Sequence, residues 1–153
     1  MNLDLSNQEQ LEQAFLAEAA ELLQTIEQSL IGLLDEKTTE KVHALMRSAH
    51  TLKGSAASVG QETIKTIAHH LEDVFQALYP QELEIDPELG ALLLDAYECL
   101  RTPLSATLMG LSYNEAEILD KTASIFAQLQ HKLGDFFGRE APLPSSEELG
   151  FDV

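Results

Sequence analysis

The sequence has no tryptophan, a single cysteine and few basic residues. Because Cys99 has no second cysteine to pair with, no internal disulfide can form, and we expect a protein of the reducing cytoplasm. Nine Lys and Arg residues stand against 26 Asp and Glu residues, which gives a formal net charge of −17. This charge repels nucleic acid and anionic membrane surfaces, so we expect neither as a partner.

Long apolar runs and nucleotide-binding loops are missing as well. No apolar stretch approaches the ~20 residues that a membrane-spanning helix needs. Residues 1–34 are rich in Glu and Gln and lack the basic start of a signal peptide. No Walker-type or glycine-rich nucleotide loop occurs, so we expect this chain by itself to have no ATP site and no enzymatic activity.

The sequence does contain five amphipathic segments. Apolar residues recur at helical spacing over residues 8–34, 39–58, 61–79, 87–102 and 114–134. The connections between them are short, which makes successive helices antiparallel neighbours. We therefore predict an all-α protein over residues 1–135, an antiparallel four-helix bundle with an additional C-terminal helix.

Several residues indicate where these helices begin and end. Ser6 and Ser112 each start a possible capping box. Asp86 followed by Pro87 is a typical helix start, with an aspartate cap and proline at the first helical position. Pro103 is expected to end or kink the fourth helix, because proline lacks the amide hydrogen that a helix interior uses.

Residues 136–153 differ from the rest of the chain in composition. They are rich in Pro, Ser, Gly and acidic residues. This composition is typical of a flexible linker. We expect the linker to lead to downstream domains of a longer protein.

The polar chemistry is concentrated in residues 49–60, AHTLKGSAASVG. His50, Lys53 and Gly54 have the spacing i, i+3 and i+4, so they share one stripe of a helix. A neutral imidazole is a nucleophile near neutral pH, and phosphoryl transfer benefits from a neighbouring cation. Glycine within a helix costs about 1 kcal/mol relative to alanine, and clearance for a partner over His50 would compensate for it. The pattern predicts a phosphorylatable histidine.

A carboxylate on the next helix supports this interpretation. If the chain turns near residue 60, Glu72 is level with His50 on the neighbouring antiparallel helix. A carboxylate there can accept a hydrogen bond from one ring nitrogen and fix the tautomer, so that the other nitrogen acts as the nucleophile. His69 lies at the edge of the same helix and is a possible helper.

The string AHTLKGSAASVG, followed by IAHHLED at residues 67–73, resembles the two motifs of histidine-containing phosphotransfer (HPt) domains. The closest resemblance is to the amino-terminal domain of chemotaxis-type histidine kinases, and it covers roughly residues 8–105. The resemblance implies the following roles: phosphorylated nucleophile for His50, phosphate stabilisation for Lys53, clearance for Gly54, orientation of the His50 imidazole for Glu72, and assistance for His69.

The resemblance also implies partners. The ATP-binding domain of a histidine kinase, in the same parent chain, would load His50, and an aspartate of a response-regulator receiver domain would unload it. ATP and Mg²⁺ are expected at those partner sites, and no cofactor is expected to be bound by this domain. Ala57 stands where many relatives have glycine, which would alter how closely a partner docks.

Other interpretations stay open. The chain could be a stand-alone HPt relay protein between two receiver domains, or a passive helical adaptor. It could also be a metal-binding bundle in which His43, His50, His69 and Glu72 converge, although bundle di-metal sites use Glu-x-x-His pairs from facing helices and this chain has one His-x-x-Glu. We interpret His43, His70 and His131 as structural or surface residues.

Overall fold

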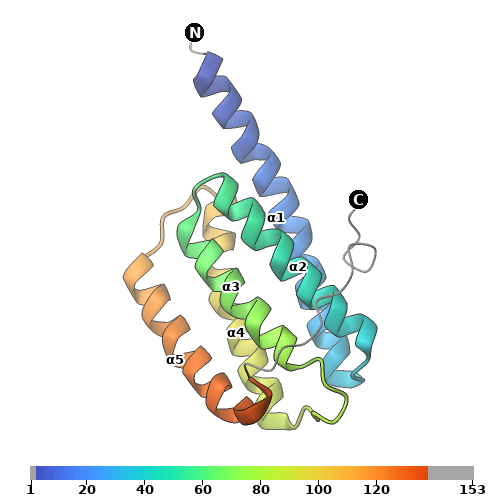
Figure 1. Cartoon of the computed structure of the whole chain (residues 1–153). Helices are drawn as coiled ribbons and strands as arrows, with labels where there is room; N and C mark the ends of the chain where they lie inside the picture. Colours follow the sequence, from blue (N-terminus) through green and yellow to red (C-terminus); the bar gives the residue numbers. More distant parts are fainter. Residues whose placement is uncertain (1–2, 138–153) are drawn as a thin grey trace.

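The computed structural model describes residues 3–137, which are helical apart from short connections. The elements are α1 (Leu3–Asp35), α2 (Thr39–Ser58), α3 (Glu62–Ala77), α4 (Pro87–Leu108), α5 (Glu115–Leu133) and the short 3₁₀ helix η1 (Gly134–Phe136). Helices α1 to α4 form an antiparallel bundle, and α5 packs against α3 and α4 (Figure 1). The predicted fold class is confirmed. Most of the predicted linker, residues 138–153, lies outside the described residues.

Each helix of the bundle buries one apolar stripe, as the spacing predicts. On α2 the buried stripe consists of Val42, Leu45, Met46, Ala49, Leu52 and Ala56. On α3, Ile64, Ile67, Leu71 and Phe75 are almost completely buried. Burial of one such large side chain stabilises a fold by about 1.5–3 kcal/mol, so these stripes fix which faces of α2 and α3 remain at the surface.

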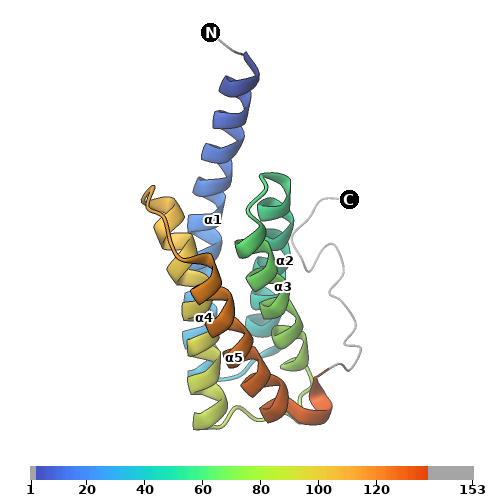
Figure 2. The same ribbon diagram turned by 90° about the vertical axis from the view of Figure 1, so that its left-hand side faces the viewer.

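Helix α1 is longer than the helices it packs against. Its N-terminal part projects beyond the end of the bundle (Figures 1 and 2), and residues 7–14 are exposed. The helix already begins at Leu3, so Ser6 lies inside it, and the prediction of a capping box at Ser6 is wrong. No proline or glycine between Leu3 and Ser6 interrupts the helix. Although α1 has 33 residues, no helix in the described part of the chain is long and apolar enough to span a membrane.

Helix α4 continues through Pro103, so the prediction that it ends near residue 102 is wrong. A proline inside a helix costs about 3 kcal/mol. The turn that follows Pro103 buries Leu104 completely, and Leu108 packs against the core. The Thr107 hydroxyl donates a hydrogen bond of 2.8 Å to the carbonyl oxygen of Pro103. Tertiary packing therefore outweighs the local preference of proline.

The predicted N-terminal cap of α4 is confirmed, and that of α5 is wrong. Asp86 caps α4, since its carboxylate accepts a hydrogen bond of 2.8 Å from the backbone amide of Leu89. Helix α5 is capped by Asn114, whose side-chain oxygen accepts from the amide of Glu117 at 3.1 Å. The predicted cap at Ser112 is therefore two residues too early. Asn is at least as good a cap as Ser, so the sequence offered two competing starts.

The turn between α2 and α3 determines the register of the two helices. Gly60 has a φ of +77°, a left-handed conformation that glycine adopts at little cost. The amide of Gln61 donates to the carbonyl of Ala56 at 2.9 Å, and the amide of Gly60 donates to that of Ala57 at 3.3 Å. This pair of bonds is a Schellman motif. It ends α2 abruptly and returns the chain antiparallel along it.

Lys37 holds the connection between α1 and α2 against the connection between α3 and α4. Its ammonium group donates to the backbone carbonyls of Pro80 and Leu83, each at 2.7 Å, and burial lowers the pKa of Lys37. We expect Lys37→Met to lower the free energy of unfolding by about 1–3 kcal/mol, because two carbonyls lose their donor. Urea unfolding followed by circular dichroism measures this. Lys65→Met, which removes a partly exposed lysine, should change stability by less than about 0.5 kcal/mol. An equal loss in both variants would contradict the role assigned to Lys37.

Candidate functional site

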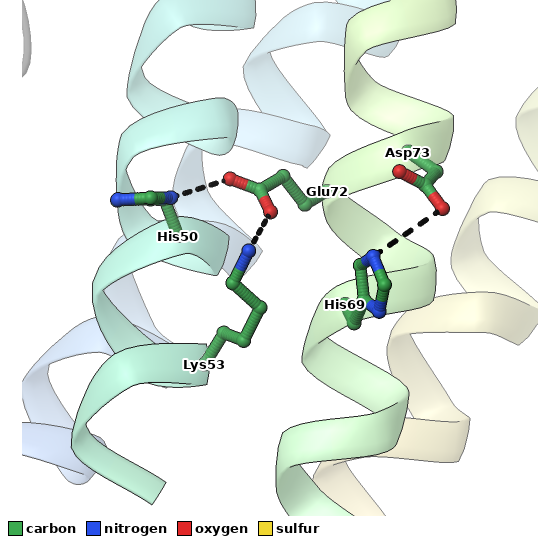
Figure 3. A network of polar contacts seen from close by, with 5 residues as sticks. All are labelled: His50, Lys53, His69, Glu72 and Asp73. Atoms are coloured by element: carbon green, nitrogen blue, oxygen red, sulfur yellow. Dashed lines mark hydrogen bonds and ion pairs between the residues drawn. The ribbon is translucent and has the colours of Figure 1, made fainter. Parts of the chain in front are cut away.

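His50 lies on the surface of α2, and its ring reaches toward α3. Its side chain is 45% exposed, and ring atom Nδ1 lies 2.7 Å from Oε2 of Glu72 on α3 (Figure 3). The Schellman turn at Gly60 explains the pairing, because His50 and Glu72 are each eleven residues from Gln61 along their helices, as the numbering shows. An exposed imidazole is thus anchored through one nitrogen.

Glu72 is buried and binds two partners. Only 7% of its side chain is exposed, and its second oxygen, Oε1, accepts a hydrogen bond of 2.6 Å from Nζ of Lys53. A buried carboxylate is costly unless it is paired and hydrogen-bonded. Lys53 supplies the opposite charge and His50 supplies the second contact, so both oxygens of Glu72 are satisfied. The three side chains form one connected cluster between α2 and α3 (Figure 3).

This geometry selects one tautomer of the neutral His50 ring. An ionised carboxylate can only accept hydrogen bonds, so the short contact requires a proton on Nδ1. In that tautomer the lone pair is on Nε2, which points away from Glu72 (Figure 3). The cluster therefore directs the nucleophilic Nε2 toward solvent and places the carboxylate of Glu72 against the opposite nitrogen of the ring.

The surface next to His50 on α2 carries little side-chain bulk. Gly54 and Ala57 are exposed on the same side of the helix, and Lys53 between them is partly exposed. Among the described residues, no heavy atom outside the helix backbone lies within 4 Å of the place where a Cβ of Gly54 would be. The packing of this domain therefore does not require glycine at position 54, which leaves the approach of another molecule as the reason for a small residue.

A stability measurement on Gly54 checks this conclusion. We expect Gly54→Ala to raise the free energy of unfolding by about 0.5–1 kcal/mol, because alanine is the better helix former and meets no neighbour. Urea unfolding measures the change. Gly60→Ala is the contrasting variant, and it should destabilise the domain because residue 60 has a positive φ. A loss of stability in Gly54→Ala would show that the glycine serves internal packing.

The structure brings three of the five predicted site residues into contact and places the other two nearby. Gly54 lies one turn from His50 along the exposed side of α2. His69, the predicted helper, is 60% exposed, and its Nε2 lies 3.9 Å from Oδ2 of Asp73 on the same helix (Figure 3). The structure thus places His69 beside the cluster and not within it.

The four residues imagined as a metal site do not converge. The ring of His43 stacks on that of Tyr79 with a centroid distance of 5.3 Å, and His69 turns toward Asp73. Among the described residues, no group of three or more His, Cys, Asp and Glu side chains is arranged to hold a metal ion.

One feature of the site was missed in the sequence. Lys53 was expected to act only on a phosphoryl group, whereas here it pairs with Glu72. The spacing contains the signal: His50 and Lys53 are one turn apart on the same stripe, so a carboxylate that reaches one is within reach of the other.

The comparison with known families agrees with this geometry. A family model described as the Hpt domain matches residues 10–103, a span that contains His50, Lys53, Gly54, His69 and Glu72. The chain belongs to the Hpt family. The matched span corresponds to α1 through most of α4, and α5 lies beyond it.

Curated relatives of this Hpt domain are chemotaxis proteins. It is similar to the chemotaxis protein CheA of Borreliella burgdorferi, with 33% identity over 112 residues, 72% of this chain and 13% of that protein. It is also similar to CheA of Bacillus subtilis, with 32% identity over 97 residues, 63% of this chain and 14% of that protein. CheA of Cereibacter sphaeroides is 29% identical over 149 residues, which cover 95% of this chain and 21% of that protein. The chain spans less than a quarter of the length of each of these proteins.

A solved structure shares the fold. The phosphorylated P1 domain of CheA3 from R. sphaeroides, crystallised in complex with CheY6, aligns with a TM-score of 0.65 over 81% of this chain and 95% of that chain. The sequence identity is 24%, so this likeness supports the fold alone.

Proposed function

We propose that this Hpt domain is a phosphocarrier, in which His50 accepts a phosphoryl group from the ATP-binding domain of a histidine kinase and passes it to an aspartate of a response-regulator receiver domain. The observation that carries the proposal is the contact between His50 Nδ1 and the buried carboxylate of Glu72. It orients the ring and directs Nε2 outward. The relatives named CheA and the complex of a P1 domain with CheY6 support this choice of partners.

In the loading step, the lone pair of Nε2 attacks the γ-phosphorus of ATP. The N–P bond forms as the bond to the β-phosphate oxygen breaks, and ADP leaves with that electron pair. The ring then carries substituents on both nitrogens and a positive charge, which the carboxylate of Glu72 balances through the Nδ1 proton. In the unloading step, an aspartate oxygen attacks the phosphorus and the electron pair of the N–P bond returns to Nε2.

Lys53 has two tasks in this scheme. In the resting domain its ammonium group pairs with Oε1 of Glu72 and satisfies that buried oxygen. Its side chain is 29% exposed and is attached one turn from His50, so it can also turn toward the phosphoryl oxygens once the ring is modified. His69 lies outside the cluster, and its role as a helper stays a prediction.

The partner domains supply the remaining chemistry. We expect ATP and Mg²⁺ to bind at the kinase and receiver sites, and this domain to act as their substrate without an enzymatic activity of its own. The relatives are several times longer than this chain, which supports a parent protein of the CheA type with a kinase domain of its own.

Transfer to a receiver tests the proposal. The domain is loaded with labelled phosphate by a CheA kinase core, separated from ATP, and mixed with a CheY-type receiver and Mg²⁺. We expect the label to leave the domain, and Ala57→Leu to slow this loss because a bulky side chain occupies the exposed surface beside Gly54. Ala123→Leu, which enlarges an exposed alanine on α5, is the matched control. Label that stays on the domain with every receiver would contradict a relay function.

A further inference from the structure

A second surface of the domain lies on the opposite edge of the bundle from His50. Helices α1 and α4 pack side by side there, and a groove of about 240 Å³ between them is lined by Leu30, Ile31 and Leu94 together with polar residues. Ile31 is 57% exposed and Leu94 is 40% exposed. Leu34, which is 37% exposed, continues this apolar strip along α1. It packs over Gly90 of α4, since a Cβ added at residue 90 would lie 3.1 Å from Cδ2 of Leu34.

The other three edges of the bundle are occupied by the His50 cluster, by α5 or by polar contacts between helices. The edge between α2 and α3 carries the His50 cluster, and α5 covers the edge between α3 and α4 (Figure 2). The edge between α1 and α2 is bridged by polar contacts, from Lys41 Nζ to the carbonyl of Gly32 at 3.0 Å and from Ser55 to Glu18. The α1–α4 groove differs from these edges because three large apolar side chains, Ile31, Leu34 and Leu94, are partly exposed together along it. The α1–α2 edge has an exposed leucine, Leu11, near its end at Val59.

Acidic side chains surround this apolar strip. Glu27, Asp95 and Glu98 line the groove, and Arg101 and Lys121 offset part of the charge of Glu98. The Tyr97 hydroxyl donates a hydrogen bond of 3.1 Å to the carboxylate of Glu27. Burial and this carboxylate raise the pKa of Tyr97 to about 12. The protonated hydroxyl therefore remains a donor that holds the Glu27 carboxylate in position at the groove.

We propose that the α1–α4 groove is a docking site for a protein partner that presents an amphipathic helix with an apolar stripe flanked by Lys and Arg residues. The groove between two helices accepts the apolar stripe, and the acidic rim pairs with the flanking cations. A second copy of this chain is a poor occupant, because a symmetric contact would bring two acidic rims together on molecules that each carry a charge of −17.

The α1–α4 groove lies away from His50, so a partner bound there does not cover the phosphorylation site. His50 lies between α2 and α3, so a partner on α1 and α4 leaves the imidazole accessible. Binding at the groove and phosphotransfer at His50 can therefore occur at the same time. The surface would hold the domain to a neighbouring protein or domain without taking part in the chemistry.

A model helix tests the proposal directly. A Leu/Lys peptide of about five helical turns, amphipathic and amidated, is titrated into the ¹⁵N-labelled domain, with a Leu/Glu peptide as the opposite-charge control. We expect saturable binding of the Leu/Lys peptide only, with amide shifts centred on α1 and α4. Raising the salt from about 0.05 M to 0.5 M should weaken binding, because the Debye length falls from more than 10 Å to less than 5 Å.

Variants decide whether the groove itself binds the peptide. The double variant Ile31→Gln with Leu94→Gln should weaken binding at least about tenfold, and Asp95→Asn should weaken it in part. The matched control is Leu111→Gln, which changes a residue that is 60% exposed outside the groove, and His50→Gln should also bind normally. Unchanged affinity in the double variant, shifts spread over the whole acidic surface, or a dimer in sedimentation without peptide would each overturn the proposal. None of these readouts depends on phosphotransfer.

Discussion

His50→Gln removes acid-labile phosphate labelling of the domain by a CheA kinase core and ATP. Glutamine has no ring nitrogen to attack phosphorus, so no phosphohistidine can form at residue 50. Its side-chain amide can still donate to Glu72, which keeps the buried carboxylate paired. Because His50 is 45% exposed, we expect the free energy of unfolding to change by less than about 0.5 kcal/mol. Base-stable, acid-labile label measures the first effect, and urea unfolding measures the second.

The matched control for this prediction is His131→Gln. His131 is an exposed histidine on α5, outside the cluster, and its replacement should leave labelling unchanged. Labelling of His50→Gln at the wild-type rate would contradict the assignment of the nucleophile. Equal loss in both variants would contradict it as well, since the effect would then not be specific to residue 50.

Glu72→Gln slows phosphorylation about 10- to 100-fold while His50 itself is intact. The variant retains the size of the side chain but removes the negative charge that balances the ring as Nε2 is phosphorylated. An amide can also donate to Nδ1, so the preference for the Nδ1–H tautomer is lost. Lys53 loses its ionic partner as well. Initial rates of labelling at saturating kinase measure this effect.

Glu62→Gln is the control for the loss of a negative charge on the same helix. Glu62 is exposed at the start of α3, and its removal should leave the rate unchanged. A Glu72→Gln variant that is phosphorylated as fast as wild type would show that the contact with His50 is structural only. Thermal unfolding of both variants separates a slower reaction from a loss of folded domain.

The hairpin that builds the site could be predicted because its signals are local. The apolar stripes of α2 and α3 have clear helical spacing, and a short turn at Gly60 makes the two helices antiparallel neighbours. Counting outward from the turn then placed Glu72 level with His50, and the structure has the contact. Spacing alone was sufficient because α-helices have a fixed rise per residue.

Other features depend on contacts between distant parts of the chain. Helix α4 continues through Pro103 because Leu104 is buried by the other helices, and no local preference reveals that burial. The spacing of His50 and Lys53 places both within reach of Glu72, whereas the depth at which Glu72 is buried depends on the surrounding helices and is not specified by local sequence. Ile31, Leu34 and Leu94 lie off the buried stripes of their helices, but local spacing does not show that α1 and α4 bring them together into one apolar strip.

The most direct test of the central claim is to identify which ring nitrogen carries the phosphoryl group. The domain is labelled with ¹⁵N, phosphorylated by a CheA kinase core, and examined by long-range ¹H–¹⁵N correlation of the histidine rings before and after loading. The expected result is a resting His50 ring protonated on Nδ1, followed by phosphorylation on Nε2 of that ring, visible as coupling between ¹⁵N and ³¹P. A phosphoryl group on Nδ1 of His50, or on another histidine, would contradict the proposed role of Glu72 and the assignment of the site.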